Sequence, residues 1–189
     1  MFIVLEGIDG SGKSTHAKLL YNYLKSKRDT ILTKEPTNTR IGKFIREILS
    51  GEVSVDPKTL CLLFTADRCE HLNSEIIPAL NDNKIVICER YYFSTIAYQM
   101  AQGVDRDWIM NLNKFALKPD IALFIDVPPE IAVRRVQKRI GHEEIFETQE
   151  FLAKIYENYM NFDLIKINGK QDINGVFAEI KDVLRSKIE

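Results

Sequence analysis

The first residues with an evident chemical role form a phosphate-binding pattern near the start of the chain. Lys13 and Ser14 close the sequence G-x-x-x-x-G-K-[ST], which lies between an apolar strand-like run and a helical pattern. Glycines let backbone N–H groups turn toward phosphate oxygens, and the N-terminus of the next helix attracts the same anion. The residues that we expect to bind the phosphates of a nucleoside triphosphate are Gly7, Ile8, Asp9, Gly10, Ser11, Gly12, Lys13, Ser14 and Thr15.

Two side chains of this pattern indicate how the triphosphate and its metal would be held. Lys13 would lie along the terminal phosphates, and the hydroxyl of Ser14 would bind Mg²⁺. A later apolar run ends at Glu89, where an acid can hold Mg²⁺ or its water in this kind of site. We therefore predict Ser14 and Glu89 as the metal-binding residues.

A basic stretch at residues 134–141 has the composition of a flap over bound nucleotide. Phosphoryl transfer needs charge neutralisation and exclusion of water, and an arginine-rich flap can supply both. For Arg134 and Lys138 taken singly, a solvent-exposed helix face is the better interpretation. We expect a mobile flap at about residues 135–148.

The elements that must position these residues alternate between short apolar runs and amphipathic helical patterns. This alternation predicts an α/β fold, a doubly wound five-stranded parallel sheet with helices on both faces, of the P-loop NTPase type. Ligands of such sheets bind outside the carboxyl ends of the strands. Glu6, Glu35, Glu89 and Asp126 end four of the predicted strands and should converge there. The predicted strands span residues 2–6, 30–34, 84–89, 120–126 and 164–167.

The length and composition fit one globular domain over residues 1–189. A formal net charge of −1 gives no electrostatic argument for nucleic acid or an anionic membrane as partner. No signal peptide or membrane-spanning run is visible, which favours a cytoplasmic location. Cys61, Cys69 and Cys88 are typical of buried thiols in a reducing compartment. The apolar residues 60–64 of a helix predicted at 56–80 are also expected to be buried.

Several classes of protein bind triphosphates through this pattern. A guanine-reading switch needs the motif N-K-x-D, but Asn83-Lys84 is followed by Ile85 and Val86, without the aspartate. A motor ATPase would normally need a longer chain and an arginine from a neighbour. A small-molecule kinase, with an acceptor pocket and a basic flap, fits the remaining features best.

Motifs along nearly the whole chain resemble the thymidylate kinase family. The phosphate-binding loop resembles that family's version, and Lys34-Glu35-Pro36 resembles its R-E-P segment. The order of the remaining motifs is also kept. They are Phe64-Thr65-Ala66-Asp67-Arg68, resembling F-x-A-x-R; Glu89-Arg90-Tyr91, resembling D-R-Y; Thr95 with Ala97-Tyr98-Gln99, resembling S-x-A-Y-Q; and Asp126-Val127-Pro128-Pro129-Glu130, resembling D-V-x-P-E.

This resemblance implies transfer of phosphate from Mg-ATP to dTMP, giving dTDP, by a homodimer. It implies that Phe64 stacks on the pyrimidine, although the sequence alone favours a core position for this ring. Tyr98 would exclude a ribose 2′-hydroxyl, and Asp9 would lie near the acceptor sugar and the metal rather than only form a turn. The implied dTMP-binding residues are Asp9, Glu35, Pro36, Arg46, Phe64, Arg68, Arg90, Thr95, Tyr98 and Gln99.

The resemblance also implies a catalytic set of Lys13, Arg90, Asp9 and one cation from the flap. Arg139 is the first choice for that cation and Arg135 the second, with Arg135 otherwise binding ATP by stacking on adenine. Glu89 stands where most of the family has aspartate, and residues 141–147 lack the family's D-R-x-E sequence. Two alternatives follow: a deoxynucleoside or broader pyrimidine monophosphate kinase, and a nucleotide-binding module without catalysis.

Overall fold

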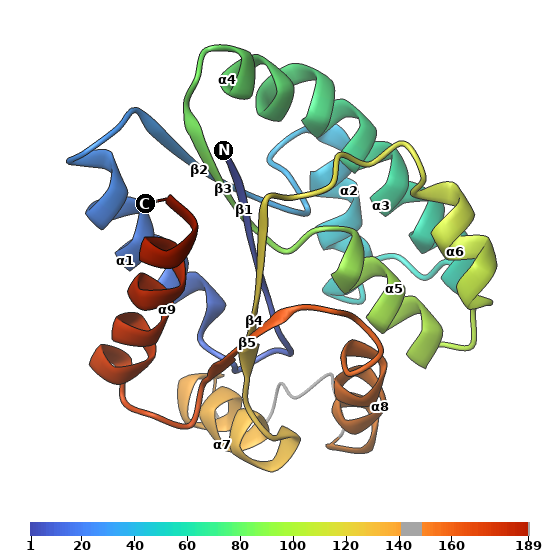
Figure 1. Cartoon of the computed structure of the whole chain (residues 1–189). Coiled ribbons are helices and arrows are strands. Elements are labelled where there is room, and N and C mark those ends of the chain that lie inside the picture. The colour runs from blue at the N-terminus through green and yellow to red at the C-terminus, as the bar shows by residue number, and fades with distance from the viewer. Residues whose placement is uncertain (141–148, 189) are drawn as a thin grey trace.

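The computed structural model contains one five-stranded parallel sheet in the order β2-β3-β1-β4-β5 (Figure 1). It describes residues 1–140 and 149–188, without the side chains of residues 139, 140 and 186–188. All four strand pairs are parallel, so the predicted α/β fold class is confirmed. The strands are β1 (Phe2–Glu6), β2 (Thr30–Lys34), β3 (Ile85–Glu89), β4 (Ile121–Asp126) and β5 (Ile165–Asn168).

Helices cover both faces of the sheet, as a doubly wound fold requires (Figure 1). On β1, Ile3 and Leu5 pack with helices α1 and α9, whereas Phe2 and Val4 pack toward Leu72 on the opposite face. This alternation follows from the two-residue period of a strand. The helices are α1 (Lys13–Lys25), α2 (Arg40–Leu49), α3 (Pro57–His71), α4 (Ile77–Asn81), α5 (Tyr92–Ala101), α6 (Arg106–Leu112), α7 (Pro129–Ile140), α8 (Gln149–Tyr159) and α9 (Ile173–Ile188).

The long helix predicted at residues 56–80 is interrupted. Between α3 and α4 lies a π-helical segment, Leu72–Ile76, which widens the helix just before Pro78. Proline lacks an N–H and its ring crowds the carbonyl four residues earlier, so regular α-helical hydrogen bonding cannot continue through it. The interruption leaves His71 and Glu75 beside the sheet edge, where they join the network described below.

Two burial predictions for α3 were wrong. Cys69 is exposed, while Cys61 and Cys88 are buried thiols as expected. Within residues 60–64, Leu60 and Cys61 are buried, but Leu62 is 47% exposed. Only one face of α3 packs against the protein, so apolar residues that encircle this helix cannot all be buried.

The start of the expected flap is helical, because α7 extends to Ile140. The rest of the expected flap, residues 141–148, lies outside the described residues. Across the helices of the described ranges, none combines the length and the apolar character needed to cross a membrane.

Candidate active site

The phosphate-binding pattern forms a loop between β1 and the N-terminus of α1. Gly12 precedes α1 with φ 96°, and no side chain caps the first turn. The first N–H groups of α1 are therefore available to an anion. Gly10 has φ 82°, and a Cβ there would lie 2.3 Å from the carbonyl oxygen of Ala132. Because only glycine allows this approach, α7 can pack directly against the loop.

Lys13 is buried inside the loop, where its Nζ donates to the carbonyl of Ile8 at 2.8 Å. Burial, together with the positive charge of Arg90, lowers the pKa of Lys13 to about 8, although Asp9 and Glu89 act in the opposite direction. The amine therefore lies in a pocket that favours binding of negatively charged phosphates. It also loses its proton at a much lower pH than an exposed lysine does.

This pKa predicts that a nucleoside triphosphate is captured less well above about pH 8. If the protein is a kinase, as its motifs imply, the kcat/KM for the triphosphate reports the free enzyme and should fall roughly tenfold per pH unit once Lys13 deprotonates. With the triphosphate saturating, bound phosphates stabilise the charged lysine, so the kcat/KM for the acceptor should not show this fall. The stability of the fold has the opposite pH dependence. Without the triphosphate, the folded protein binds the Lys13 proton more weakly than the unfolded chain does. The free energy of unfolding should therefore increase as the pH rises above about 8.

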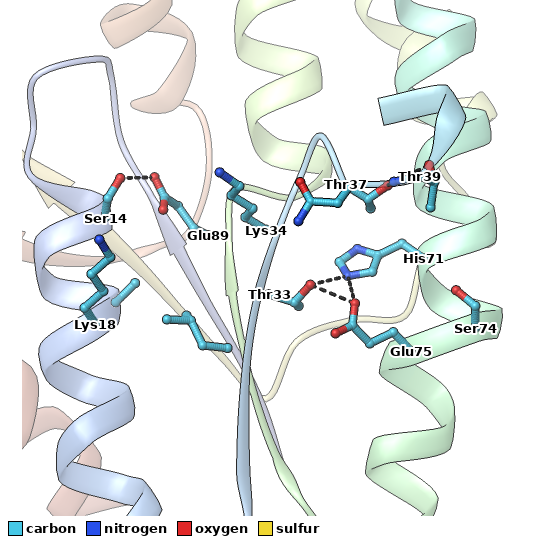
Figure 2. A pocket seen from close by; sticks show the side chains of 13 residues that line it. Ser14, Lys18, Thr33, Lys34, Thr37, Thr39, His71, Ser74, Glu75 and Glu89 are labelled. Atoms are coloured by element: carbon cyan, nitrogen blue, oxygen red, sulfur yellow. Dashed lines mark hydrogen bonds and ion pairs between the residues drawn. The ribbon is translucent and has the colours of Figure 1, made fainter. Parts of the chain in front are cut away.

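Ser14 and Glu89 meet at the metal position predicted from sequence. The Ser14 hydroxyl donates to Glu89 Oε1 at 2.6 Å. A hydroxyl and a carboxylate are hard oxygen ligands, which suit Mg²⁺ bound together with substrate phosphates. Both residues line a cleft of about 780 Å³ beside the edge strand β2. Figure 2 shows the pair in this cleft, with Lys34 next to Glu89 and the cluster of Thr33, His71 and Glu75 on the opposite side.

Asp9, Arg90 and Tyr98 form a polar cluster next to the loop. An Arg90 nitrogen lies 2.5 Å from Asp9 Oδ1 and 3.1 Å from the Tyr98 hydroxyl, which itself donates to Asp9 at 3.1 Å. Removal from water would raise the pKa of Asp9, but Arg90 and then Lys13 hold that pKa well below its usual value. Asp9 is therefore ionised, and it orients the guanidinium of Arg90.

Arg68 is fully buried and bound on three sides. Its guanidinium donates to Glu35 Oε2 at 2.6 Å, to Thr95 at 2.9 Å and to Asn113 Oδ1 at 2.5 Å. Its Nε has no hydrogen-bond partner. This geometry connects α3, α5 and the end of β2, and it leaves two of the five N–H donors, one of them at Nε, for a ligand or a water molecule.

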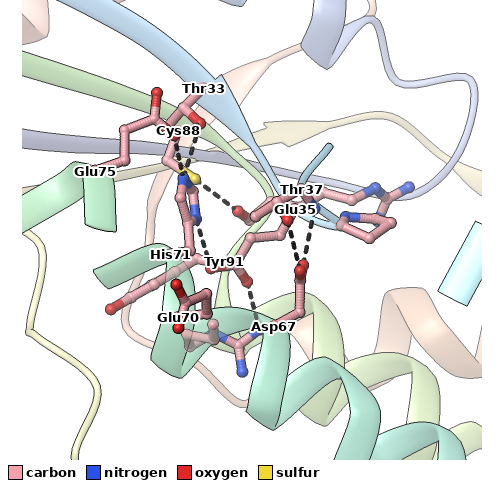
Figure 3. A network of polar contacts seen from close by, with 12 residues as sticks. Thr33, Glu35, Thr37, Asp67, Glu70, His71, Glu75, Cys88 and Tyr91 are labelled. Atoms are coloured by element: carbon pink, nitrogen blue, oxygen red, sulfur yellow. Dashed lines mark hydrogen bonds and ion pairs between the residues drawn. The ribbon is translucent and has the colours of Figure 1, made fainter. Parts of the chain in front are cut away.

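Glu35 also contacts His71, as Figure 3 shows. His71 Nδ1 lies 3.2 Å from Glu35 Oε1, and its Nε2 lies 2.8 Å from Thr33 and 3.1 Å from Glu75. Glu35, His71 and Cys88 are close enough to share a metal ion. However, Arg68 already binds Glu35 and the Cys88 thiol donates to the carbonyl of Arg90. We interpret the cluster as a hydrogen-bonded support for Arg68.

The loop after β2 is held from two sides. Asp67 accepts from the backbone N–H and the hydroxyl of Thr37 at 2.8 and 2.6 Å, and from the Thr39 hydroxyl at 3.1 Å. Arg46 donates to the carbonyls of Pro36 and Thr37 at 3.0 and 2.7 Å. Arg46 thus binds the loop that carries Pro36.

The remaining predicted residues lie in different surroundings. Phe64 is half-buried and belongs to none of the apolar core clusters of the described residues, which disfavours the core interpretation. Gln99 is buried with an unpaired Oε1. Arg135 donates to the carbonyl of Gly169 at 3.0 Å. The Arg139 side chain lies outside the described residues.

The strand-end acids reach the same end of the sheet but do not share one crevice. Glu89 lies at the cleft, whereas Glu6 and Glu35 are buried and Asp126 accepts from Tyr156. Sequence reasoning missed the supporting residues. Asp67 lies inside a motif already noted and could have been found, but nothing local marks these others: His71, Ser94, Asn113 and Tyr159.

Comparison with known proteins gives one consistent result. The family model described as thymidylate kinase matches residues 5–180. A protein of Methanocaldococcus jannaschii named "probable thymidylate kinase" is 44% identical over 98% of this chain and 96% of its own length. One of the same name from Pyrococcus horikoshii is 38% identical over 99% and 97%. A "thymidylate kinase" of onion yellows phytoplasma is 45% identical over 85% and 82%. The chain belongs to the thymidylate kinase family.

Proposed function

We propose that this protein transfers the γ-phosphoryl group of Mg-ATP to the 5′-phosphate of dTMP, giving ADP and dTDP. The observation that carries the proposal is the cluster of Asp9, Arg90 and Tyr98 directly beside Lys13. Lys13 would bind the donor triphosphate and Arg90 the acceptor phosphate. Such positioning, together with charge neutralisation, is most of what phosphoryl transfer requires.

On the donor side, the loop amides and Lys13 would hold the β- and γ-phosphates. Ser14 and Glu89 would hold Mg²⁺, which when bound neutralises charge on those phosphates. Arg135 lies on α7, which packs against Gly10 through Ala132, and would contact the nucleotide. Arg139, one helical turn further along α7, remains our first choice for the cation that the flap supplies to the transferred phosphate. We also propose that the flap at residues 135–148 belongs to the single domain.

On the acceptor side, Arg90 would clamp the phosphate, with Arg46 moving from the carbonyls of the loop to assist. A bidentate guanidinium suits a phosphate better than a lysine does. No general base is needed, because the attacking phosphate oxygen is already ionised near neutral pH. Glu6, which is buried and already bound by several donors, is not available as a base.

Thymine recognition would use two unpaired buried atoms and one ring. Arg68 Nε is a free donor and Gln99 Oε1 a free acceptor. A thymine edge offers the matching pair, a carbonyl acceptor and an N–H donor, and a site built to satisfy such a pair discriminates strongly. Phe64 would stack on the base, and Pro36 would border it. Thr95 and Glu35 would orient Arg68. Tyr98 would exclude a ribose 2′-hydroxyl.

The proposal includes a homodimer in the cytoplasm. Helix α3 contacts both α2 and α6, and these three helices expose Phe44, Leu49, Leu62 and Met110, residues that a second copy could cover. Light scattering should then give twice the chain mass of 21.8 kDa, and a mass of one chain would contradict the dimer. The three cysteines are free thiols, which agrees with a reducing compartment.

The test is acceptor-dependent ADP release with Mg-ATP, comparing dTMP, dUMP, the ribose counterpart of dTMP, dCMP and thymidine. We expect strong turnover with dTMP and weaker turnover with dUMP, since one methyl group is worth only about 1–3 kcal/mol. The ribose form should be nearly inactive. Turnover with thymidine but not dTMP would identify a nucleoside kinase, and ATP binding without any turnover would identify a non-catalytic module.

A further inference from the structure

Glu6, the last residue of β1, is a fully buried carboxylate directly before the phosphate-binding loop. It accepts from the backbone N–H of Tyr91 at 2.8 Å and of Ser94 at 3.4 Å. It also accepts from the hydroxyls of Ser94 at 2.6 Å and Tyr159 at 2.8 Å. An ionised carboxylate has about four acceptor sites. The surrounding donors therefore match the charged form of Glu6, although burial raises its pKa.

This carboxylate acts as the N-terminal cap of α5. The residue at the cap position, Tyr91, makes no side-chain capping bond, and the first turn of α5 has no acidic residue. Glu6 instead reaches across from β1 to the N–H groups of Tyr91 and Ser94. A negative charge at this end of a helix is favourable, and Glu6 supplies the acceptor for the Tyr91 N–H, while the Ser94 N–H also donates to the carbonyl of Tyr91 at 3.1 Å.

The residue just before this cap is Arg90, whose backbone is in the left-handed region at φ 65°. A non-glycine residue adopts this conformation only when its surroundings fix it. Glu6 fixes the residue after Arg90 through the N–H of Tyr91. It also binds Ser94, whose hydroxyl accepts from an Arg90 nitrogen at 3.2 Å. Both the backbone and the guanidinium of Arg90 are thus linked to one carboxylate.

Helix α8 also contacts the Glu6 carboxylate. Tyr159 belongs to α8 and is buried, and its hydroxyl lies within 2.8 Å of both Glu6 and Ser94. Asn158 adds a second link, donating to the carbonyl of Ala97 in α5 at 2.8 Å. The Glu6 carboxylate therefore joins β1, α5 and α8 at one buried point.

We propose that Glu6 is a positioning residue that holds Arg90 for the acceptor phosphate, with Ser94 and Tyr159 as its partners. The inference rests on the proposed function, because it assigns the acceptor phosphate to Arg90. It predicts a selective effect: loss of the Glu6 charge weakens binding of dTMP and leaves binding of ATP nearly intact.

The principal variant is Glu6→Gln, which keeps the size of the side chain and removes its charge. We expect the KM for dTMP to rise about tenfold or more, the scale of a lost hydrogen bond to a charged group, and the KM for ATP to stay within about twofold. Tyr159→Phe removes one donor and should raise the KM for dTMP about threefold. This second variant decides the question if Glu6→Gln does not fold.

Tyr156→Phe is the matched control. Tyr156 lies on the same helix and donates to a strand-end carboxylate, Asp126, at 2.8 Å. It is not part of the Glu6 cluster, so its removal should change neither KM by more than about twofold. A Tyr159→Phe variant that behaves like this control would overturn the inference.

A double-variant comparison separates positioning from general support of the fold. If Glu6 acts through Arg90, Glu6→Gln should have little further effect on kcat/KM for dTMP in an Arg90→Ala background. An undiminished effect in that background, or an equal rise in both KM values for Glu6→Gln alone, would overturn the inference. Absence of dTMP turnover in the unaltered protein would instead count against the proposed function.

Discussion

Replacing Arg90 with alanine should reduce kcat/KM for dTMP by about 10³-fold, with the affinity for ATP little changed. Arg90 is held by Asp9, Tyr98 and Ser94 and ends a strained turn, so its guanidinium is already positioned before substrate binds. Burial would lower its pKa, but Asp9, Tyr98 and Tyr159 together raise that pKa well above the usual value. The charge is therefore present at every working pH. Steady-state kinetics and calorimetric ATP binding measure the two effects separately.

Arg185→Ala is the control for this experiment. Arg185 lies near the end of α9, is exposed, and pairs only loosely with Asp182 at 3.3 Å. Its removal should leave kcat/KM for dTMP within about twofold. If Arg90→Ala lost no more activity than this control, Arg90 could not be the group that binds the acceptor phosphate.

Replacing Lys13 with methionine should lower kcat by about 10³-fold and also weaken ATP binding. Lys13 is the cation inside the loop, and its Nζ contacts the carbonyl of Ile8 at 2.8 Å, whereas the nearest acid of the described residues, Asp9, is 3.9 Å away. That amine is thus free to turn to the phosphates when ATP arrives. Methionine keeps the length and packing of the side chain, so the loss should be electrostatic.

Lys25→Met is the corresponding control on the same helix. Lys25 lies in the last turn of α1, exposed, with its amine over the ring of Tyr21. We expect wild-type kcat and ATP affinity for this variant. Retention of more than a tenth of kcat by Lys13→Met would contradict the assigned role, and circular dichroism would show whether each variant is folded.

The fold could be predicted from sequence because local and global signals agree. Each strand is a short apolar run, each is followed by a helical pattern, and Gly7 to Ser14 mark the first strand-to-helix junction. The errors arose where packing overrides a local pattern. Apolar Leu62 faces outward, and Pro78 forces a π-helical segment into what reads as one helix.

The site could be predicted only in part, for a similar reason. Lys13, Ser14 and Glu89 are marked by their places at strand ends and loops, and the structure brings Ser14 and Glu89 together. Asn113 and Tyr159 are distant in sequence from every motif, yet they contact Arg68 and Glu6. Such contacts depend on how α6 and α8 pack against the rest of the protein, and the spacing of residues in the sequence does not predict this packing.

The measurement that tests the account most directly is ³¹P NMR of the unaltered protein with Mg-ATP and dTMP at neutral pH. The account predicts that dTMP and ATP disappear together and that ADP and a new diphosphate, dTDP, appear in equal amounts. Omission of dTMP should leave ATP unchanged, because water, which the site does not hold in line, would have to attack in place of the acceptor phosphate. Formation of ADP and inorganic phosphate without dTDP, or no reaction at all, would contradict phosphoryl transfer to dTMP.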